Sequence, residues 1–303
     1  MSSTKEIKRK ITSIKNTGKI TKAMELISTV KMKKAQDLVL EKKDFVFEML
    51  KIFLRVEKHL SDFPIFNEGK GKKTLAVIIT SNKGLCGGYN INVMKKVSNY
   101  IKETGEELEF ISLGKRGAQF VAKTGNKLLA DFSEEFSDNI EPIFAMKISK
   151  LMKEEFLSGN YKKVVVFYNY YVNTIKQVPS AKVTLPVKQD SLKVYLEKIA
   201  GQFFDLEEEK KKIDGIHGYA VEPSVSKVAD EVLPIILNMM FFDTILEAKA
   251  SEHSSRMIAM KNAKDSANKI ADKLTLSYNK ARQAAITREV SEITAGVESM
   301  KDL

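Results

Sequence analysis

Hydrophobic residues recur at helical spacing over a long stretch at the start of the chain. From Thr4 to Lys58 most residues are good helix formers, and the stretch contains no proline and a single glycine, Gly18. The apolar stripe predicted on this helix consists of Ile7, Ile11, Ile14, Ile20, Met24 and Ile27. At 1.5 Å per residue the helix would be roughly 80 Å long, far beyond an ordinary globular helix. The pattern therefore predicts a rod.

A second stretch, from Ile235 to about Ala295, contains no proline or glycine and also predicts a long helix. Its apolar and small residues alternate at spacings of four and three, which is the heptad repeat of a coiled coil. The predicted seam consists of Leu246, Ala250, His253, Met257, Met260, Lys264, Ala267, Ala271, Leu274, Tyr278, Ala281 and Ala285. Because the chain leaves and re-enters the same intervening region, we expect the two rods to pair as an antiparallel coiled coil.

The hydrophobic period changes between the two rods. Short apolar runs rich in β-branched residues alternate there with helical patterns. Strands are predicted at Thr74–Thr80, Leu108–Leu113 and Lys163–Val172, and helices at Ile91–Lys102, Arg116–Lys123 and Pro142–Leu157. The segment Val178–Val187 contains two prolines and is expected at a sheet edge. This order predicts a Rossmann-like, mostly parallel, doubly wound sheet.

Glycine and proline gather in the middle of the chain and mark the domain boundaries. All six prolines lie between Pro64 and Pro234. The predicted fold class is α/β, with a long antiparallel coiled coil of the N- and C-terminal helices plus a Rossmann-like domain. The predicted domains are an N-terminal coiled-coil helix at residues 1–62, a globular domain at 72–200, a charged connector at 201–217 and a C-terminal coiled-coil helix at 218–303.

Composition narrows the class of protein. The chain has 303 residues, 43% of them hydrophobic, one cysteine and a formal net charge of +11. A single Cys86 cannot form an internal disulfide, which favours a reducing compartment. We identify no signal peptide and no apolar run near the ~20 residues of a membrane-spanning helix. We therefore expect a cytoplasmic protein that meets a membrane through partners.

The stretch most typical of an enzyme is a glycine-rich turn after the first strand, with Gly84, Cys86, Gly87 and Gly88. Such turns bind phosphates in doubly wound folds, because backbone N–H groups and the helix N-terminus attract anions. The spacing matches neither G-x-G-x-x-G nor the P-loop, and no Lys-Ser or Lys-Thr pair follows. A tight structural turn is the favoured interpretation, and a nucleotide-binding enzyme is the alternative.

Metal ligands and catalytic groups are scattered along the chain. The three histidines, His59, His217 and His253, lie far apart, and His253 falls on the coiled-coil seam, where it is expected to pack between helices. Because no ligand cluster is recognisable, we predict no catalytic residue, no metal and no cofactor.

Positive charge is concentrated near the N-terminus. Residues 1–34 contain ten lysines and arginines against Glu6 and Glu25. A basic helix indicates an anionic partner. These residues include no aromatic side chain on which nucleic-acid bases would stack, so an acidic protein surface is favoured. A nucleic-acid adaptor and a merely solvated face are the alternatives.

Several segments together resemble the γ subunit of the F-type ATP synthase, in its bacterial-like form. They are Lys5–Lys34, Gly84–Asn92, Gln177–Pro179, Ser251–Lys261 and Tyr278–Glu292. The resemblance implies two long terminal helices in an antiparallel coiled coil with a Rossmann-like domain, in agreement with the hydrophobic pattern. It also implies a central rotor that transmits rotation between an ion-driven membrane ring and the catalytic α/β hexamer, without being a catalyst itself.

The resemblance further implies partners and contact residues. The partners are the α and β subunits, the ε subunit and the c-subunit ring, with no nucleic acid, on the cytoplasmic side of a bacterial cell membrane. Carried over position by position, the contacts with the acidic lever of the β subunit fall on Lys19, Lys22, Met24 and Arg256. Those near the far end of the shaft fall on Gln283, Thr287 and Glu289.

Overall fold

The computed structural model describes residues 4–40, 43–56, 63–188, 190–192, 194–195, 222 and 224–299. The chain divides into two compact units. The helix-pair unit consists of Met1–Ser28 and Arg256–Leu303, and the sheet unit consists of Thr29–Ser255. Two long helices, α1 (Thr4–Leu40) and α8 (Val225–Ser299), each run through the boundary between the units.

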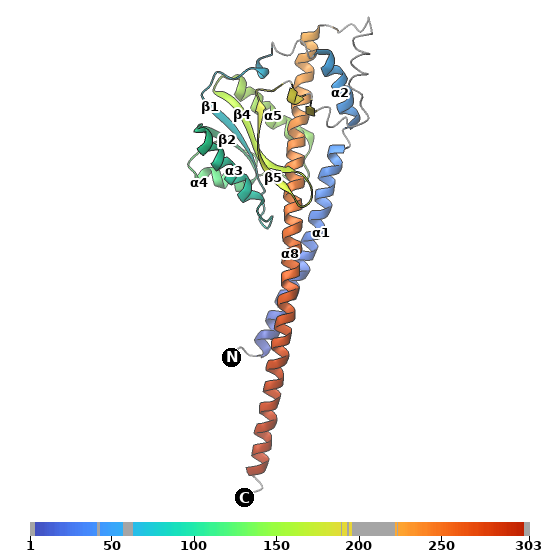
Figure 1. Ribbon diagram of the computed structural model, residues 1–303, viewed down its shortest axis with the longest axis vertical. Coiled ribbons are helices and arrows are strands. Elements are labelled where there is room, and N and C mark those ends of the chain that lie inside the picture. The colour runs from blue at the N-terminus through green and yellow to red at the C-terminus, as the bar shows by residue number, and fades with distance from the viewer. Residues whose placement is uncertain are drawn as a thin grey trace. The chain divides into compact units, whose positions relative to one another are not determined.

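The described strands of the sheet unit form one five-stranded sheet in the order β3-β2-β1-β4-β5 (Figure 1). They are β1 (Lys73–Ile79), β2 (Leu108–Leu113), β3 (Lys127–Asp131), β4 (Tyr161–Tyr171) and β5 (Gln177–Leu185). β1 pairs in parallel with β2 and β4, and β2 with β3, whereas β5 runs antiparallel to β4 at one edge. The chain reverses its progress across the sheet between β1 and β4, as in doubly wound folds. The predicted Rossmann-like sheet is confirmed.

Helices cover both faces of the sheet, because side chains on each strand alternate between two buried clusters. On β1, Val77 and Ile79 belong to one cluster, while Ala76 and Ile78 belong to the other. The elements that close the second cluster are α3 (Tyr89–Thr104) and α4 (Lys115–Lys123). Those that close the first are α5 (Pro142–Leu157), α2 (Lys43–Val56), the 3-10 helix η2 (Pro64–Phe66) and the first part of α8.

The helix-pair unit is held by small and polar residues. A Cβ atom added at Gly18 of α1 would lie 3.6 Å from the Cβ of Ala267 on α8, so the two backbones approach closely there. Further along α1, Glu25 accepts a hydrogen bond of 2.8 Å from Lys264. Higher numbers on α1 thus meet lower numbers on α8. The antiparallel pairing of the two terminal helices is confirmed.

Both terminal helices have bounds that differ from the prediction. The stretch predicted as one helix from Thr4 to Lys58 is described as α1 and α2, with residues 41–42 outside the described residues. The C-terminal helix begins before the predicted Ile235 and contains Pro234. Proline removes one hydrogen bond from a helix interior. Burial of the neighbouring Leu233 in the sheet unit stabilises the helix against this loss.

The predicted apolar stripe on α1 is correct at Ile7, Ile11, Ile14 and Met24. Within the helix-pair unit the buried or partly buried positions of α1 are Thr4, Ile7, Ile11, Ile14, Gly18, Thr21, Met24, Glu25 and Ser28. Ile20 and Ile27, by contrast, are 62% and 54% exposed. The small residues Gly18 and Thr21 occupy the buried face where the backbones come closest, so the apolar period alone assigned Ile20 and Ile27 to the wrong side.

On α8 the predicted seam holds over most of its length. Met260, Ala267 and Ala271 are buried in the helix-pair unit. Ala285, however, is exposed, as is every described side chain from residue 282 to 297. The seam therefore ends near Ala281, which is partly buried.

Some sequence predictions concern residues or boundaries that the structure does not test. The predicted domain bounds follow element type rather than compact units and stay a prediction. The connector at residues 201–217, together with His59 and His217, lies outside the described residues.

Candidate functional site

The glycine-rich turn joins the end of β1 to the start of α3. Gly87 has a φ of 58° and Leu85 has a φ of 61°, and both therefore adopt the left-handed conformation that favours glycine. Gly88 is the N-cap residue of α3, and Cys86 is buried beneath the turn. A Cβ atom added at Gly84 would lie 3.6 Å from a guanidinium nitrogen of Arg116. The four predicted turn residues thus lie in one tightly folded segment.

Side chains of the protein itself satisfy polar groups of this turn. Asn90, in the first turn of α3, accepts a hydrogen bond of 2.9 Å from the Ser81 N–H. Its amide nitrogen donates to Ser81 Oγ at 2.8 Å and to Cys86 Sγ at 3.2 Å. Ser81 Oγ donates in turn to the Lys83 carbonyl at 2.6 Å. In a phosphate-binding turn the backbone N–H groups would face the ligand, but here Asn90 takes the place of a ligand at Ser81.

Two further asparagines close the carboxyl edge of the sheet, where doubly wound folds bind their ligands. Asn82 donates to the carbonyls of Ser133 and Phe136, both at 2.8 Å. Asn169, on β4, is buried and donates to the Tyr89 carbonyl at 2.9 Å. Hydrogen bonds within the protein therefore connect the ends of β1, β3 and β4 at this edge. This arrangement favours a structural turn over a nucleotide site.

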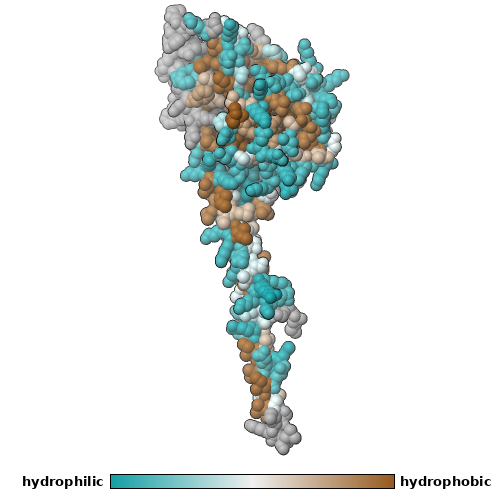
Figure 2. All heavy atoms as spheres, turned by 180° about the vertical axis from the view of Figure 1, so that it is seen from behind, coloured by the Kyte–Doolittle hydropathy of each residue, from teal (hydrophilic) through white to brown (hydrophobic). Residues whose placement is uncertain are grey.

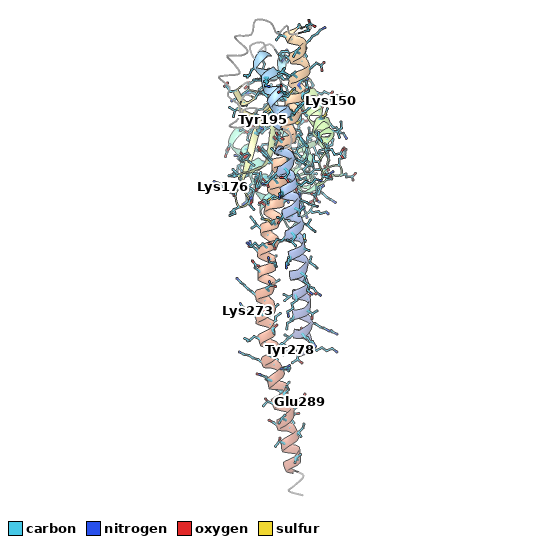
Figure 3. The ribbon with its side chains drawn as sticks, turned by 90° about the vertical axis from the view of Figure 1, so that its right-hand side faces the viewer. Lys150, Lys176, Tyr195, Lys273, Tyr278 and Glu289 are labelled. Atoms are coloured by element: carbon cyan, nitrogen blue, oxygen red, sulfur yellow. The ribbon has the colours of Figure 1, made fainter. Side chains whose placement is uncertain are left out.

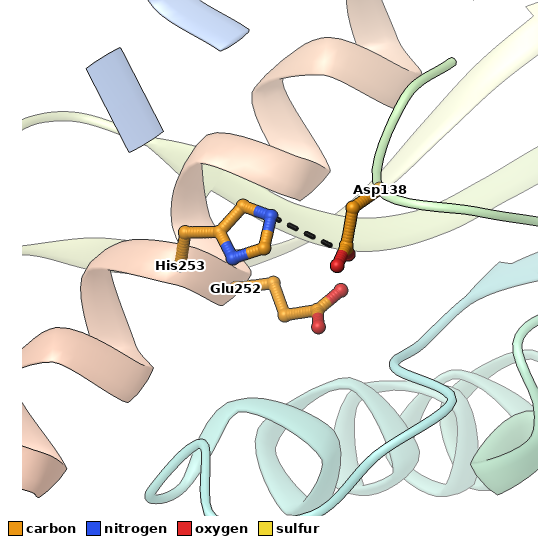
Figure 4. Close-up of side chains that lie close together, drawn as sticks. All are labelled: Asp138, Glu252 and His253. Carbon is orange, nitrogen blue, oxygen red and sulfur yellow. Dashed lines mark ion pairs between the residues drawn. The ribbon is translucent and has the colours of Figure 1, made fainter. Parts of the chain in front are cut away.

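A charged cluster joins two parts of the sheet unit (Figure 4). Asp138 lies in the loop between β3 and α5, while Glu252 and His253 are buried on α8. His253 Nε2 lies 3.6 Å from Asp138 Oδ1, and the ligand atoms of the three residues lie within 4.8 Å of one another. His253 was expected to pack between the two long helices, yet it faces a loop, because the sheet unit brings that loop against α8.

Lys249 supplies positive charge to this cluster. Its Nζ lies 3.6 Å from Asp138 Oδ1 and 3.5 Å from Glu252 Oε2. Lys31 of α1 donates a hydrogen bond of 2.5 Å to Asp138. Burial raises the pKa of Asp138, but the Lys31 hydrogen bond and the neighbouring positive charges lower it by more, to about 2. A metal ion bound by these carboxylates would have to displace the Lys249 ammonium, so the donor set fits an internal ion-pair network better than a metal site.

The predicted contacts for an acidic partner separate into two places. Lys19 and Lys22 are exposed on α1 and, three residues apart, are neighbours on the helix surface. Met24 is partly buried. Arg256 is buried on α8, roughly 12 Å along the helix axis from Lys264. The structure therefore groups Lys19 with Lys22 but does not group Arg256 with them.

The predicted contacts near the far end of α8 lie on an exposed helix. Gln283, Thr287 and Glu289 are all exposed. Figure 3 shows Glu289 on a stretch of α8 beyond Tyr278, along which no other described helix runs.

An apolar stripe that sequence analysis missed lies on this same stretch of α8. It consists of Ile286, Val290, Ile293 and Val297, all exposed. Spacings of four, three and four residues place these side chains on one helix face. This spacing of apolar residues is visible in the sequence and could have identified the stripe. An apolar helix face in water is typical of a partner-binding surface.

Comparisons with known proteins agree with this architecture. A family model described as ATP synthase matches residues 3–300. The ATP synthase gamma chain of Halothermothrix orenii is 35% identical over 99% of this chain and 100% of the relative. That of Nitrosomonas eutropha is 32% identical over the same shares.

Solved structures give the same result. A chain of the Tetrahymena thermophila mitochondrial ATP synthase, from its central stalk and c-ring, matches with a TM-score of 0.55 and 25% identity, covering 80% of this chain and 99% of that chain. A chain of the Euglena gracilis mitochondrial ATP synthase rotor shares the fold, with a TM-score of 0.61 and 18% identity over 93% of this chain and 98% of that chain.

The fold and these matches define a central-stalk subunit of an ATP synthase. The chain belongs to the ATP synthase gamma chain family. Among the described helices, none combines the length and the apolar character that crossing a lipid bilayer requires.

Proposed function

We propose that this chain is the rotor of its ATP synthase, transmitting rotation between an ion-driven membrane ring and a catalytic α/β hexamer for ATP synthesis or hydrolysis. In this role the chain is not itself a catalyst. Its partners are the α and β subunits, the ε subunit and the c-subunit ring, and it is peripheral on the cytoplasmic side of a bacterial cell membrane. Family membership supports each of these assignments.

The observation that carries the proposal is the exposed end of α8. A stretch of helix that ends in an apolar stripe, Ile286 to Val297, requires a surrounding surface to bury it. A shaft standing inside a ring of subunits meets that requirement. Gln283, Thr287 and Glu289 lie on the same exposed stretch and would contact the same ring.

The basic surface of α1 supports a contact with an acidic lever. Lys19 and Lys22 are exposed to solvent, so a carboxylate-rich partner can reach both. Complementary charge fixes partner and register more than it adds affinity. We assign this contact to the β subunit, with Met24 as a further contact residue and Arg256, which is buried on α8, as a separate one.

The alternative of a nucleotide-binding enzyme makes a different prediction for the isolated chain. Because Asn82, Asn90 and Asn169 close the carboxyl edge of the sheet with internal hydrogen bonds, we expect no saturable ATP binding. Isothermal titration of the purified full chain with ATP tests this expectation. Saturable binding that is abolished by a bulky residue at Gly87 would favour the enzyme.

Charge reversal tests the rotor itself. The double variant Lys19→Glu and Lys22→Glu should impair ATP-driven ion pumping by the reconstituted assembly, because like charges would then meet across the contact. Folding should change by no more than a few tenths of a kcal/mol, as for other exposed positions. Lys95→Glu with Lys102→Glu, two exposed lysines of α3, is the control. Unchanged pumping by the α1 double variant would contradict the proposed lever contact.

A further inference from the structure

An apolar groove lies between α5 and the first part of α8. Its volume is about 850 Å³, and Ile140 and Leu237, both buried, line its floor. On the rim, Ile143 is 64% exposed and Met146 is 45% exposed. Figure 2 shows apolar residues in brown among polar ones in teal on the globular part of the molecule. Two large apolar side chains so exposed beside a groove are typical of a docking surface.

The rim of the groove carries positive charge on one side. Lys147, Lys150 and Lys153 follow one another at three-residue spacing along α5 and all line the groove. Lys147 is bound to Glu135, with both carboxylate oxygens within 2.9 Å of its Nζ. Lys150, labelled in Figure 3, lies 3.8 Å from Glu154, and because both side chains are exposed to water this pair is weak. The ammonium groups of Lys150 and Lys153 can therefore donate hydrogen bonds to carboxylates of a partner.

The elements that line the groove favour a helix over an extended peptide as its ligand. Helices α5 and α8 supply most of the lining, and among the described residues that line the groove none belongs to a β-strand. An extended peptide would lack a strand edge to pair with, whereas a helix can set one apolar face between two others. Ile143 and Met146, three residues apart, form the kind of ridge into which such a helix packs.

We infer that this groove is the docking site for an amphipathic helix of a partner protein, one whose apolar stripe is flanked by aspartate or glutamate. Its apolar residues cover Ile143 and Met146, and its carboxylates meet Lys150 and Lys153. The inference rests on the proposed function in one respect, which is that the partner is sought among the other subunits of the same assembly. It adds a contact surface that is separate from both long-helix contacts.

Photo-crosslinking in the intact assembly tests the inference. Replacing Ile143 with the photoreactive p-benzoylphenylalanine places the probe on the exposed rim. After irradiation, mass spectrometry of the adduct should identify a helical segment of another subunit, with apolar residues three or four apart and acidic residues beside them. No adduct, an adduct within this chain or on a lipid, or one on a basic or extended segment would overturn the inference.

Charge variants sharpen this result. Lys150→Glu with Lys153→Glu should lower the yield of the adduct by about tenfold, because carboxylates would then face carboxylates. Lys95→Glu with Lys102→Glu should leave the yield unchanged. Equal yields from both double variants would overturn the assignment of an acidic flank. ATP-driven ion pumping, measured separately on the same assembly, reports on the rotor proposal, so the two proposals can fail independently.

Discussion

The two compact units of the chain bury different kinds of residues. The sheet unit buries large side chains such as Phe110, Phe167 and Ile111, each completely shielded from water. The helix-pair unit buries mostly small residues such as Gly18, Ala267 and Ala271, with Met260 as a larger one. A large apolar side chain contributes about 1.5–3 kcal/mol when it is fully buried, and an alanine much less. The sheet unit therefore draws its stability from apolar area, whereas the helix pair depends on close approach of its backbones.

The largest effect should come from removing a large side chain of the sheet unit. Phe167→Ala leaves a cavity under Tyr100, whose ring packs edge-on at 5.2 Å between centroids, and should destabilise the unit by about 3–5 kcal/mol. Hydrogen-exchange mass spectrometry should show faster exchange in β1 and β4. Equal acceleration in residues 256–278 of α8 would contradict the difference between the two units.

A proline in the helix pair should destabilise the helix-pair unit and leave the sheet unit folded. Ala271→Pro removes a helix hydrogen bond and kinks α8, at a cost of about 3 kcal/mol or more. Exchange should accelerate in α8 around residue 271 and in α1 before Gly18, while the sheet unit keeps its protection. Ala285→Pro, in the unpaired stretch of α8, is the control and should leave α1 unaffected. If Ala271→Pro exposes β1 to exchange, the units are not separate.

A larger side chain in place of a seam alanine tests how closely the two helix backbones approach. Ala267→Leu places a larger side chain next to Gly18 and should cost about 1–3 kcal/mol. Ala285→Leu makes the same chemical change on an exposed surface, where an effect of a few tenths of a kcal/mol is expected. Exchange of the α1 amides between residues 11 and 25 measures the difference. Equal effects at both positions would mean that backbone proximity does not limit the seam.

The smallest effect concerns a buried carboxylate of the sheet unit. The hydrogen bond from Lys73, opposed by burial and aided by Tyr161 and Lys127, lowers the pKa of Glu109 from 4.5 to about 2. A depressed folded-state pKa contributes stability above pH 4.5, and this contribution is lost as the pH falls toward 2.

Glu109→Gln should therefore destabilise the sheet unit at pH 7. The loss should be only about 1 kcal/mol, because water screens the exposed lysines that pair with Glu109. The difference between variant and parent should shrink as pH falls from 5 and vanish near pH 2. Hydrogen exchange of β2 at several pH values, corrected for intrinsic rates, measures it. A difference that does not depend on pH would mean that shape, and not charge, matters at this position.

Sequence patterns predicted elements well where turn residues bound a strongly apolar run. The predicted bounds of β2 and α5 agree with the structure, since glycine or proline and polar residues flank both. Strand β3 was missed because Leu128, Leu129 and Ala130 form a short run that is only partly buried. Pro234 led to a late start for α8, because tertiary burial outweighs a local helix break.

The candidate site was less predictable from sequence. The exposed, neighbouring positions of Lys19 and Lys22 could be predicted because charge and helical period are local properties, while their contact with a partner stays a prediction. The asparagines that close the sheet edge and the pairing of His253 with Asp138 depend on distant segments meeting, which no local pattern reports. The apolar stripe from Ile286 to Val297 could have been predicted from the helical spacing of its residues.

The ion pair between Lys264 and Glu25 contributes more to the alignment of the two helices than to the strength of their contact. A seam of small residues offers nearly equivalent surfaces after a slide by one heptad, but that slide would set Lys264 against Gly18 and Glu25 against Met257, leaving both charges without their partner. Sliding is therefore disfavoured even where the packing would tolerate it. This pair of charges is therefore one of the contacts that set the length by which α8 reaches past α1.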